Sequence, residues 1–450
     1  MRPGLIDHYG EKRLPRYTSY PTAPFFSEAV SHETYAQWLA SLPTGLSASF
    51  YLHIPFCRAL CWYCGCHTTV TRHGAPVADY LAALRREIEL VRDCLGHALP
   101  VRHVHFGGGT PTIMEPAAFL DLVDLLRHRF HVAGDAEIAI EIDPRTLTAA
   151  MISALGRAGV TRASLGVQSF DRTVQAAVNR VQSFEQTATA VERLRGAGVK
   201  GINLDLIYGL PHQTVASCMD TVAQCLALSP DRFAVFGYAH VPAFKRHQRL
   251  VDETALPDGA ARLAQAAAIA DLLEGAGYKP IGLDHYALPG DLMTKAGTAR
   301  RLRRNFQGYT TDPGDILIGL GASAIGRLTQ GYVQNDTSLG GYATRVTRGD
   351  FATVKGHALT PDDRLRADII ERLMCDLRVD VGELCRRHGA PAEALLQANP
   401  RMHDLARDGL AQLDGFVVSV PDEARSLVRC VASAFDAYLD SSGRPGSRAV

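Results

Sequence analysis

The sequence has no long hydrophobic run and no excess of charge of either sign. No stretch reaches the roughly 18 consecutive apolar residues of a transmembrane helix, and the amino-terminal segment lacks the apolar core of a signal peptide. Lys and Arg number 47, and Asp and Glu also number 47, a balance that argues against a dedicated nucleic-acid-binding protein. We therefore expect a soluble, cytoplasmic protein without nucleic-acid or membrane partners.

The composition is that of an ordinary globular enzyme. The chain has 450 residues, of which 46% are hydrophobic and 21% are charged, so wholesale disorder is excluded. At roughly 150 residues per domain the length allows three domains, but one large α/β domain with a smaller one fits equally well.

Strand-like runs alternate with amphipathic helical stretches from about residue 49 onward. The six runs are SFYLHI (49–54), VRHVHF (101–106), AEIAIEI (136–142), RASLGV (162–167), GINLDLIYG (201–209) and RFAVFGYA (232–239). Between the first two, Val77, Leu81, Leu84 and Ile88 recur at helical spacing. This alternation predicts a parallel sheet with right-handed crossovers. Periodicity does not choose between an open doubly wound sheet and a full or partial barrel.

The composition and the hydrophobic pattern of the sequence change several times along the chain. We expect an irregular N-terminal arm (1–45), an α/β core (46–285), an extension carrying substrate and cofactor loops (286–360), a mostly helical domain (361–440) and a disordered tail (441–450). In the helical domain, AQLDGFVVSV predicts a β-hairpin with Asp414-Gly415 at its turn.

Cysteine is scarce outside one cluster. Of ten cysteines, Cys57, Cys61, Cys64 and Cys66 lie in one short segment directly after the first strand, and we expect the other six to be small core side chains. In a cytoplasmic protein such a cluster more often binds metal than forms disulfides. The carboxyl end of a strand is also where α/β proteins build their sites.

The spacing of the cluster favours iron and sulfur over zinc. Cys57, Cys61 and Cys64 form C-x3-C-x2-C, which suits three thiolate ligands of a four-iron, four-sulfur ([4Fe-4S]) cluster with one iron left open. A structural zinc site needs four ligands and would recruit Cys66. One residue between Cys64 and Cys66 is tight for two ligands of one zinc, although the spacing does not exclude it.

The motif C-x3-C-x-aromatic-C, with Tyr63 before the last cysteine, resembles the signature of radical S-adenosylmethionine (SAM) enzymes. Further motifs run in the order seen in oxygen-independent coproporphyrinogen III oxidases, also called coproporphyrinogen dehydrogenases: PRYTSYPTA (15–23), FGGGTPT (106–112), EIDP (141–144), GVQSF (166–170), LDLIYGLP (204–211), YAHVP (238–242), RNFQGYTT (304–311) and GASAI (321–325). The resemblance covers nearly the whole chain. It implies a partial (βα) barrel of radical SAM type with a parallel sheet, an N-terminal arm and a smaller, mostly helical C-terminal domain.

Cofactor roles follow from the same resemblance. From the residues alone, the glycines after the second strand predict either a close approach of the backbone to a ligand or a tight turn. Glu141 and Asp205 are either ribose-binding carboxylates or members of ion pairs. The resemblance implies two SAM molecules: the first at Gly108 and Glu141, the second at Gly109, Thr110, Gln168, Arg180 and Asp205, with backbone or packing contacts from Tyr51, Tyr63, Ala239 and Ile325.

Cys66 is expected to have a catalytic role rather than to bind the cluster. In an extended loop its side chain lies about 6–7 Å beyond that of Cys64, and three thiolates with one SAM leave no iron for it. We expect it near the substrate or the second SAM molecule.

The densest basic run, ARRLRRN (299–305), is either a solvated helix face or a site for an anionic substrate. The resemblance implies coproporphyrinogen III, which carries four propionates, and Arg16, Arg303 and Arg304 are candidates to bind them. The implied reaction converts two propionates to vinyl groups by a 5′-deoxyadenosyl radical that removes a β-hydrogen, giving protoporphyrinogen IX in haem biosynthesis. An electron donor protein such as flavodoxin or ferredoxin and a monomeric chain are also implied.

Three alternatives remain. A haem-binding chaperone of the same superfamily commonly lacks the cysteine that matches Cys66 and the long N-terminal arm, and both features are present here. A haem-degrading radical relative is the second alternative. A four-cysteine zinc module that binds nucleic acid is disfavoured by the zero net charge.

Overall fold

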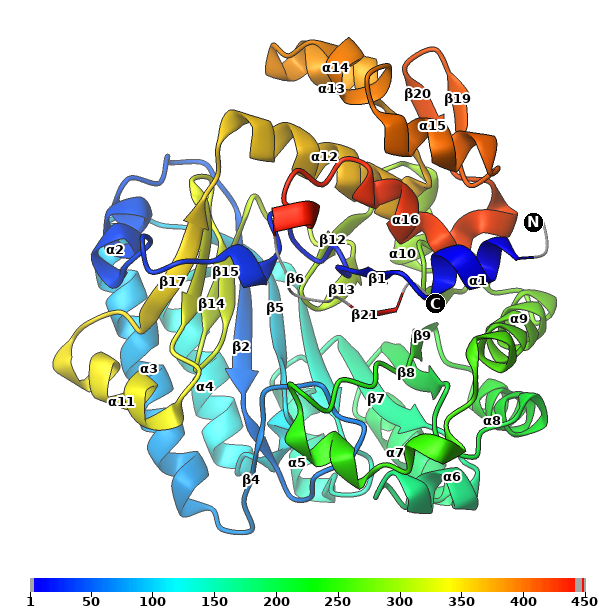
Figure 1. Ribbon diagram of the computed structural model, residues 1–450. Helices are drawn as coiled ribbons and strands as arrows, with labels where there is room; N and C mark the ends of the chain where they lie inside the picture. Colours follow the sequence, from blue (N-terminus) through cyan, green and yellow to red (C-terminus); the bar gives the residue numbers. More distant parts are fainter. Residues whose placement is uncertain (1–3, 442–446, 449–450) are drawn as a thin grey trace.

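The computed structural model describes residues 4–441 and 447–448. A curved sheet with helices on its outside makes up most of the molecule, and a smaller helical unit packs beside it (Figure 1). Within the described residues, no helix has both the length and the apolar character needed to cross a lipid bilayer.

The six predicted strands are confirmed. They are β2 (Ala48–Ile54), β5 (Pro100–Gly108), β6 (His131–Ile142), β7 (Arg162–Gln168), β8 (Gly201–Tyr208) and β9 (Arg232–Gly237). These strands lie side by side in chain order, each parallel to its neighbours, and β14 (Ile316–Leu320) adds in parallel beside β2. Their carboxyl ends therefore meet at one rim, where the following loops build a common site.

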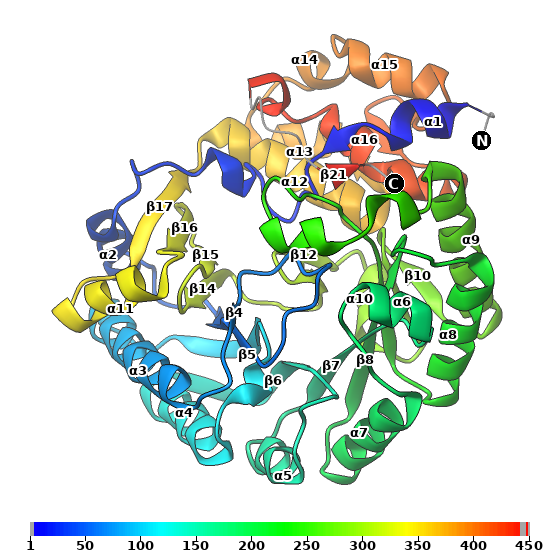
Figure 2. The same cartoon turned by 60° about the horizontal axis from the view of Figure 1, so that its bottom comes forward.

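Helices cover the outer face of this sheet, as Figure 2 shows. They are α3 (Ala75–Leu95), α4 (Pro116–Arg129), α5 (Ala149–Arg157), α7 (Phe184–Gly196), α8 (Val215–Ala227) and α9 (Gly259–Gly275). The periodic residues of α3, including Val77, Leu81, Leu84 and Ile88, are buried in the main core. An apolar stripe at helical spacing thus packs each crossover helix against the strands.

The sheet is a partial barrel. Antiparallel strands extend both ends: β11 (His285–Ala287) and β10 (Lys279–Ile281) beyond β9, and β15 (Ile325–Arg327), β16 (Gly331–Asn335) and β17 (Thr353–Ala358) beyond β14. Among the described strands, β10 and β17 are the two edges and do not pair with each other. The partial-barrel expectation is confirmed, whereas an open doubly wound sheet with helices on both faces is not what forms.

The C-terminal unit is mostly helical, as expected. It comprises α12 (Pro361–Asp376), α13 (Val381–His388), α14 (Ala392–Leu396), α15 (Pro400–Arg407), α16 (Val428–Ser433) and a small sheet of β18 (Arg378–Asp380), β19 (Gln412–Asp414) and β20 (Val417–Ser419). Asp414 pairs with Val417, so the predicted hairpin is present but its turn is Gly415-Phe416, one residue later than expected.

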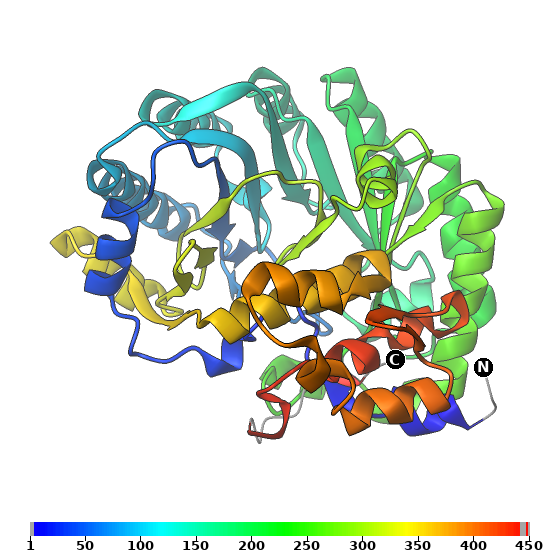
Figure 3. The ribbon, with the colours of Figure 1, turned by 90° about the horizontal axis from the view of Figure 1, so that it is seen from above.

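The N-terminal arm is more regular than expected. It contains α1 (Leu5–Gly10), β1 (Arg13–Leu14) and α2 (His32–Ala40). Tyr9, Leu14, Tyr17 and Tyr20 are buried in the same core as α12 and α16, and the Tyr17 hydroxyl donates to Asp436 at 3.0 Å. Because α2 packs on α3 and β17, the arm joins the helical unit to the barrel edge (Figure 3).

Three described residues of the predicted disordered tail belong to elements of the structure. Ser441 ends a short 3-10 helix, Leu439–Ser441, and Ser447–Arg448 form β21, which pairs antiparallel with β1 with Ser447 opposite Leu14. The prediction of disorder is wrong for these three residues. Residues 442–446 and 449–450 lie outside the described part of the chain.

Buried ion pairs link neighbouring strands nearer their amino-terminal ends than their carboxyl ends. His103 on β5 lies 3.3 Å from Glu137 on β6 and 3.7 Å from Asp312, and Arg162 on β7 lies 3.3 Å from Glu137. Burial opposes the charged imidazole, but hydrogen bonds with Asp312 and Glu137 outweigh it and raise the pKa of His103 to about 9.

We predict that His103 makes stability fall with pH on the alkaline side. The folded-state pKa lies above the ordinary value of 6.5, so the stabilisation is complete below pH 6.5 and is lost as the pH rises through about 9. The Tm of the unmodified protein should decline more steeply between pH 6.5 and 9.5 than that of a His103→Gln variant. Equal slopes would contradict the role given to His103.

Candidate functional site

The cysteine loop leaves the barrel at the carboxyl end of β2. Cys57 lies in the short strand β3 (Phe56–Cys57), which pairs with β4 (Thr69–Val70) and so folds the loop back on itself. Cys61 is buried, Cys57 and Cys64 are partly buried, and Cys66 is exposed.

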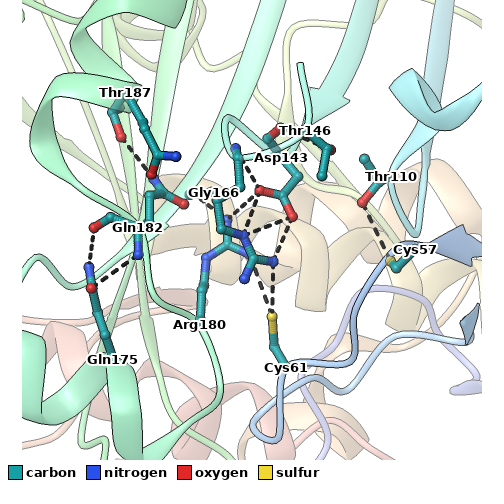
Figure 4. Close-up of polar contacts among 12 residues, drawn as sticks. Cys57, Cys61, Thr110, Asp143, Thr146, Gly166, Gln175, Arg180, Gln182 and Thr187 are labelled. Atoms are coloured by element: carbon teal, nitrogen blue, oxygen red, sulfur yellow. Dashed lines mark hydrogen bonds and ion pairs between the residues drawn. The ribbon is translucent and has the colours of Figure 1, made fainter. Parts of the chain in front are cut away.

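Polar groups donate to the sulfur of Cys57 and of Cys61. The hydroxyls of Thr68 and Thr110 donate to Cys57 Sγ at 3.3 and 3.4 Å. The guanidinium of Arg180 donates to Cys61 Sγ at 3.5 Å, and Figure 4 shows Arg180 beside Cys61 and Thr110 beside Cys57. Such donors stabilise the thiolate form that a metal cluster requires.

The third predicted ligand, Cys64, accepts hydrogen bonds from Cys66. The Cys66 backbone N–H donates to Cys64 Sγ at 3.4 Å. Hydrogen bonds from the Cys66 side chain and backbone together lower the pKa of Cys64 to about 7. Cys66 therefore lies directly beside Cys64.

The donor set fits an iron–sulfur cluster better than a zinc ion. Among the described residues, no three His, Cys, Asp or Glu side chains converge as ligands of a single metal ion. A structural zinc would draw four side chains to one point. A [4Fe-4S] cluster binds each thiolate at a different iron, so Cys57, Cys61 and Cys64 can hold it while remaining apart.

The glycines at the end of β5 and directly after it allow that strand to touch the end of β2. A Cβ atom on Gly108 would lie 2.6 Å from the His53 ring, and one on Gly109 would lie 2.5 Å from the Phe56 carbonyl oxygen. Gly108 also has a φ of 110°, which strains any other residue. Because no side chain fits here, Thr110 can reach the cysteine loop, and its N–H donates to the Phe56 carbonyl at 2.7 Å.

The residues predicted for the first SAM molecule lie together. Glu141, at the end of β6, accepts a hydrogen bond from the Gly108 N–H at 3.1 Å and lies 3.3 Å from His105 Nε2. A Cβ atom on Gly107 would touch both Glu141 and the Tyr51 ring. Tyr51, Gly108 and Glu141 thus share one corner of the barrel rim.

Asp205 is a buried carboxylate on β8. Ser164 donates to its two oxygens at 2.9 and 3.0 Å, and Asn203 Nδ2 donates to one of them at 2.7 Å. Burial raises the pKa of Asp205 to about 7, and the Glu141 carboxylate acts in the same direction. Ser164 and Asn203 belong to no functional motif, and no sequence pattern pointed to them.

Gln168 and Arg180 both lie beside Gly166, where an added Cβ atom would be 3.0 Å from Gln168 Nε2 and 2.9 Å from an Arg180 guanidinium nitrogen. Arg180 is buried, donates to the Gly166 carbonyl at 2.6 Å and lies 3.6 Å from Asp143. Gln168 has a φ of 68°, and its buried Oε1 has no hydrogen-bond partner within the described residues. Asp143 also binds Arg145 at 2.7 Å, and its place in the EIDP motif is the one signal that could have identified it.

Side chains of a segment after β9 form hydrogen bonds with backbone carbonyls of the cysteine loop. The contacts are Lys245 Nζ with the Cys66 carbonyl (3.0 Å), His247 Nε2 with that of Cys64 (2.7 Å), and Gln248 Nε2 with those of Tyr63 (3.0 Å) and Ala239 (3.2 Å). Backbone carbonyls are present at every residue, so these three side chains could not be recognised from the sequence.

On the other side of the site, Glu87 of α3 fixes the turn that leads to Ile325. Its buried carboxylate accepts from the Gly321 N–H at 2.6 Å, the Tyr342 hydroxyl at 2.8 Å and Asn335 Nδ2 at 2.6 Å. Ile325 begins β15 directly after this turn. Glu87 lies far from Ile325 in the sequence, and no pattern pointed to it.

The basic run does not form a helix face. Arg303 and Arg304 lie on β12 (Arg303–Asn305), so the solvated-helix interpretation is wrong for them. Arg303 pairs with Glu371 of α12 at 3.0 Å. Arg304 lies 4.3 Å above the Tyr309 ring, and its Nη2 donates to the Arg16 carbonyl at 3.4 Å. Its Nε and Nη1 are buried without a hydrogen-bond partner in the described chain.

A pocket lies between the arm, β14 and α12. Arg303, Arg304 and the arm segment 17–20 line it. None of the described cofactor candidates is among its lining residues, so this pocket is separate from the rim where the cysteine loop lies.

Comparison with known proteins gives concordant results. Residues 51–225 match the model of the radical SAM superfamily. The chain is 60% identical over 450 residues to the oxygen-independent coproporphyrinogen III oxidase of Bradyrhizobium diazoefficiens, covering 100% of both chains. It is 40% identical over 434 residues to that of Pseudomonas aeruginosa, covering 96% of this chain and 94% of the relative.

The fold agrees with a solved structure along nearly its whole length. Coproporphyrinogen III oxidase from Escherichia coli, a radical SAM enzyme, superposes with a TM-score of 0.91 at 37% identity, covering 97% of this chain and 99% of that one. The match therefore includes the arm, the barrel and the helical unit, and leaves 3% of this chain outside it. The chain belongs to the oxygen-independent coproporphyrinogen III oxidase family of the radical SAM superfamily.

Proposed function

We propose that this chain carries out the anaerobic oxidative decarboxylation of coproporphyrinogen III to protoporphyrinogen IX in porphyrin and haem biosynthesis. The observation that carries the proposal is the 60% identity over 450 residues to an enzyme of that name. The same identity favours it over a haem-degrading relative, and the presence of Cys66 and the N-terminal arm favours it over the haem-binding chaperone.

Cys57, Cys61 and Cys64 would hold a [4Fe-4S] cluster in this enzyme. When bound, the cluster and SAM supply the 5′-deoxyadenosyl radical that removes a hydrogen from the propionate β-carbon. The protein binds the cluster and holds the cysteine loop in place, with Arg180 and Thr110 stabilising negative charge on sulfur.

Two SAM molecules bind at the barrel rim in this proposal. Glu141 and the Gly108 backbone orient the first. The second is bound by Gly109, Thr110, Gln168, Arg180 and Asp205, and Tyr51, Tyr63, Ala239 and Ile325 pack against one molecule or the other. The adjacency of Tyr51, Gly108 and Glu141 supports the first assignment, and the positive guanidinium of Arg180 suits a carboxylate.

The substrate is a tetrapyrrole with four propionates, and Arg16 and Arg304 bind its carboxylates. The ion pair between Arg303 and Glu371 favours Arg304 over its neighbour. The reductant is a small electron donor protein such as flavodoxin or ferredoxin. The enzyme acts as a monomer in the cytoplasm, and its parts are the arm (1–45), core (46–285), extension (286–360) and helical domain (361–440).

Anaerobic purification and a product assay test this function. Iron and sulfide should be found in equal amounts at about four each per chain, as a single [4Fe-4S] cluster requires. Incubation with SAM, a reductant and coproporphyrinogen III should yield protoporphyrinogen IX. A loaded cluster that cleaves SAM but leaves this substrate unchanged would overturn the proposal.

We predict that mutating Cys66 has a different effect on the cluster from mutating Cys57, Cys61 or Cys64. Cys57→Ser, Cys61→Ser or Cys64→Ser should each lose the broad brown absorption of the cluster while the barrel remains folded. Cys66→Ser should keep the iron content and the spectrum but lose most conversion of coproporphyrinogen III. Loss of the cluster in Cys66→Ser would make Cys66 a ligand.

We predict that the two neighbouring arginines of β12 behave differently. Arg304→Ala should weaken the affinity for coproporphyrinogen III by about tenfold or more, the loss expected for one hydrogen-bonded charge pair. Arg303→Ala should change the affinity little, because Arg303 is already paired. The KM of each variant for coproporphyrinogen III is the measurement. Equal changes in KM in the two variants would contradict the assignment of substrate binding to Arg304.

We predict that the Asp205 carboxylate binds SAM and destabilises the folded protein. A carboxyl whose pKa rises from 3.8 to about 7 on folding destabilises the folded state increasingly between those pH values. Asp205→Asn should raise the Tm by a few degrees at pH 8, with a gain that disappears near pH 4. The same variant should bind one SAM molecule instead of two. A lower Tm at pH 8 would contradict this prediction.

A further inference from the structure

Two neighbouring side chains after β9 hold the two peptide groups that flank Cys64. Gln248 Nε2 donates to the Tyr63 carbonyl at 3.0 Å, and His247 Nε2 lies 2.7 Å from the Cys64 carbonyl. Because a peptide group is planar, holding both of these groups restricts the φ and ψ angles of the residue between them. The backbone of Cys64, the third predicted ligand, is therefore held by the 3-10 helix η3 (Arg246–Leu250).

Gln248 also joins the cysteine loop to the residues that follow β9. Its Nε2 donates to the Ala239 carbonyl at 3.2 Å, and its Oε1 accepts from the Val241 N–H at 2.6 Å. A side-chain amide has two N–H donors, and here they bond carbonyls of two different segments. One side chain thus links the peptide before Cys64 to residues 239–241.

The amide of Gln248 lies inside the protein. The residue is 1% exposed, and burying an amide is costly unless its polar atoms are paired. Replacing the donor would leave the carbonyls of Tyr63 and Ala239 without this partner. A buried acceptor left without a hydrogen bond costs more than the net gain from forming one, so the bridge resists separation of the two segments.

These hydrogen bonds do not use the cysteine sulfurs. Each joins a side chain of residues 245–248 to a backbone carbonyl, and Lys245 Nζ forms the same kind of contact with the Cys66 carbonyl at 3.0 Å. They therefore orient Cys64 and Cys66 without competing for the atoms that would bind iron. Groups that support the ligands in this way determine how precisely a metal site is held.

We propose that Gln248 is a positioning residue that fixes Cys64 relative to Ala239, and thereby the cluster relative to the SAM molecule that packs against Ala239. This inference rests on the proposed function. A misplacement of about 1 Å can slow a reaction by about a hundredfold. Without the bridge, the 5′-deoxyadenosyl radical would more often take its hydrogen atom from another C–H or S–H group than from the propionate, so that cleavage of SAM becomes uncoupled from conversion of the substrate.

Amide hydrogen exchange of the cluster-loaded enzyme, measured anaerobically without substrate, tests the bridge itself. The Cys64 N–H donates to the Cys61 carbonyl at 3.1 Å and should be protected in the unmodified enzyme. Gln248→Glu keeps the size of the side chain but turns a carboxylate oxygen toward two carbonyls. It should speed the exchange of residues 61–66 by about tenfold or more, because the loop opens more easily.

The ratio of SAM cleaved to coproporphyrinogen III converted tests the positioning. In cluster-loaded Gln248→Glu this ratio should rise by about threefold or more, at an iron content equal to that of the unmodified enzyme. A merely structural role would lower the amount of active enzyme, and with it both rates equally, and would leave the ratio unchanged.

Gln265→Glu is a matched control. Gln265 is also 1% exposed, donates through Nε2 to the Gln213 carbonyl at 2.7 Å and accepts from the Gly209 N–H at 2.9 Å. Its hydrogen bonds join α9 to the loop after β8 instead of the cysteine loop. The variant should lower the Tm, as Gln248→Glu does, but should leave the exchange of residues 61–66 and the ratio unchanged.

The inference fails if Gln248→Glu changes the exchange no more than Gln265→Glu does, or if the exchange rises while the ratio stays the same. If Gln248→Glu does not fold, Gln248→Met, which is uncharged and of similar length, is judged by the same two measurements. Exchange of residues 61–66 in the unmodified enzyme as fast as in an unstructured peptide overturns the inference whatever the variants do. Failure of the unmodified enzyme to convert coproporphyrinogen III would instead overturn the proposed function, and the exchange measurement needs no substrate.

Discussion

The close approach of β5 to the end of β2 is the constraint on which the site depends. The N–H groups of Gly109 and Thr110 bind the carbonyls of Ile54 and Phe56 at 2.9 and 2.7 Å. A Cβ atom on Gly109 would lie 2.5 Å from the Phe56 carbonyl oxygen, which is closer than a Cβ atom approaches any non-bonded atom. Cys57 follows Phe56 directly, so this contact determines where the cysteine loop begins and which hydroxyls reach its first sulfur.

Permanent positive charge is built into the interior near the cysteine loop. Arg180 and Arg145 share Asp143 and both donate to Cys61 Sγ. Thiolates bound to iron carry negative charge, and fixed guanidiniums stabilise it without any proton transfer.

The arm and the helical unit are one structure built from the two ends of the chain. Tyr9, Leu14, Tyr17 and Tyr20 share an apolar core with α12 and α16, and the arm's α2 packs on the barrel helix α3. A change in the helical unit is therefore transmitted to the arm through packed side chains rather than through a flexible linker.

The sequence by itself located the central strands, helix α3 and the cysteine loop. Period-two and period-3.6 patterns located the six central strands and helix α3, because burial on one face leaves that periodicity in the sequence. The spacing of Cys57, Cys61 and Cys64 and the glycines before Thr110 identified the site. Only the tertiary structure decided which residues surround it. Ser164, Lys245 and Glu87 act through contacts between distant segments, often with backbone atoms, and such contacts leave no local pattern. Arg303 and Arg304 are adjacent in sequence but have different partners, since neighbouring side chains on a strand point to opposite faces.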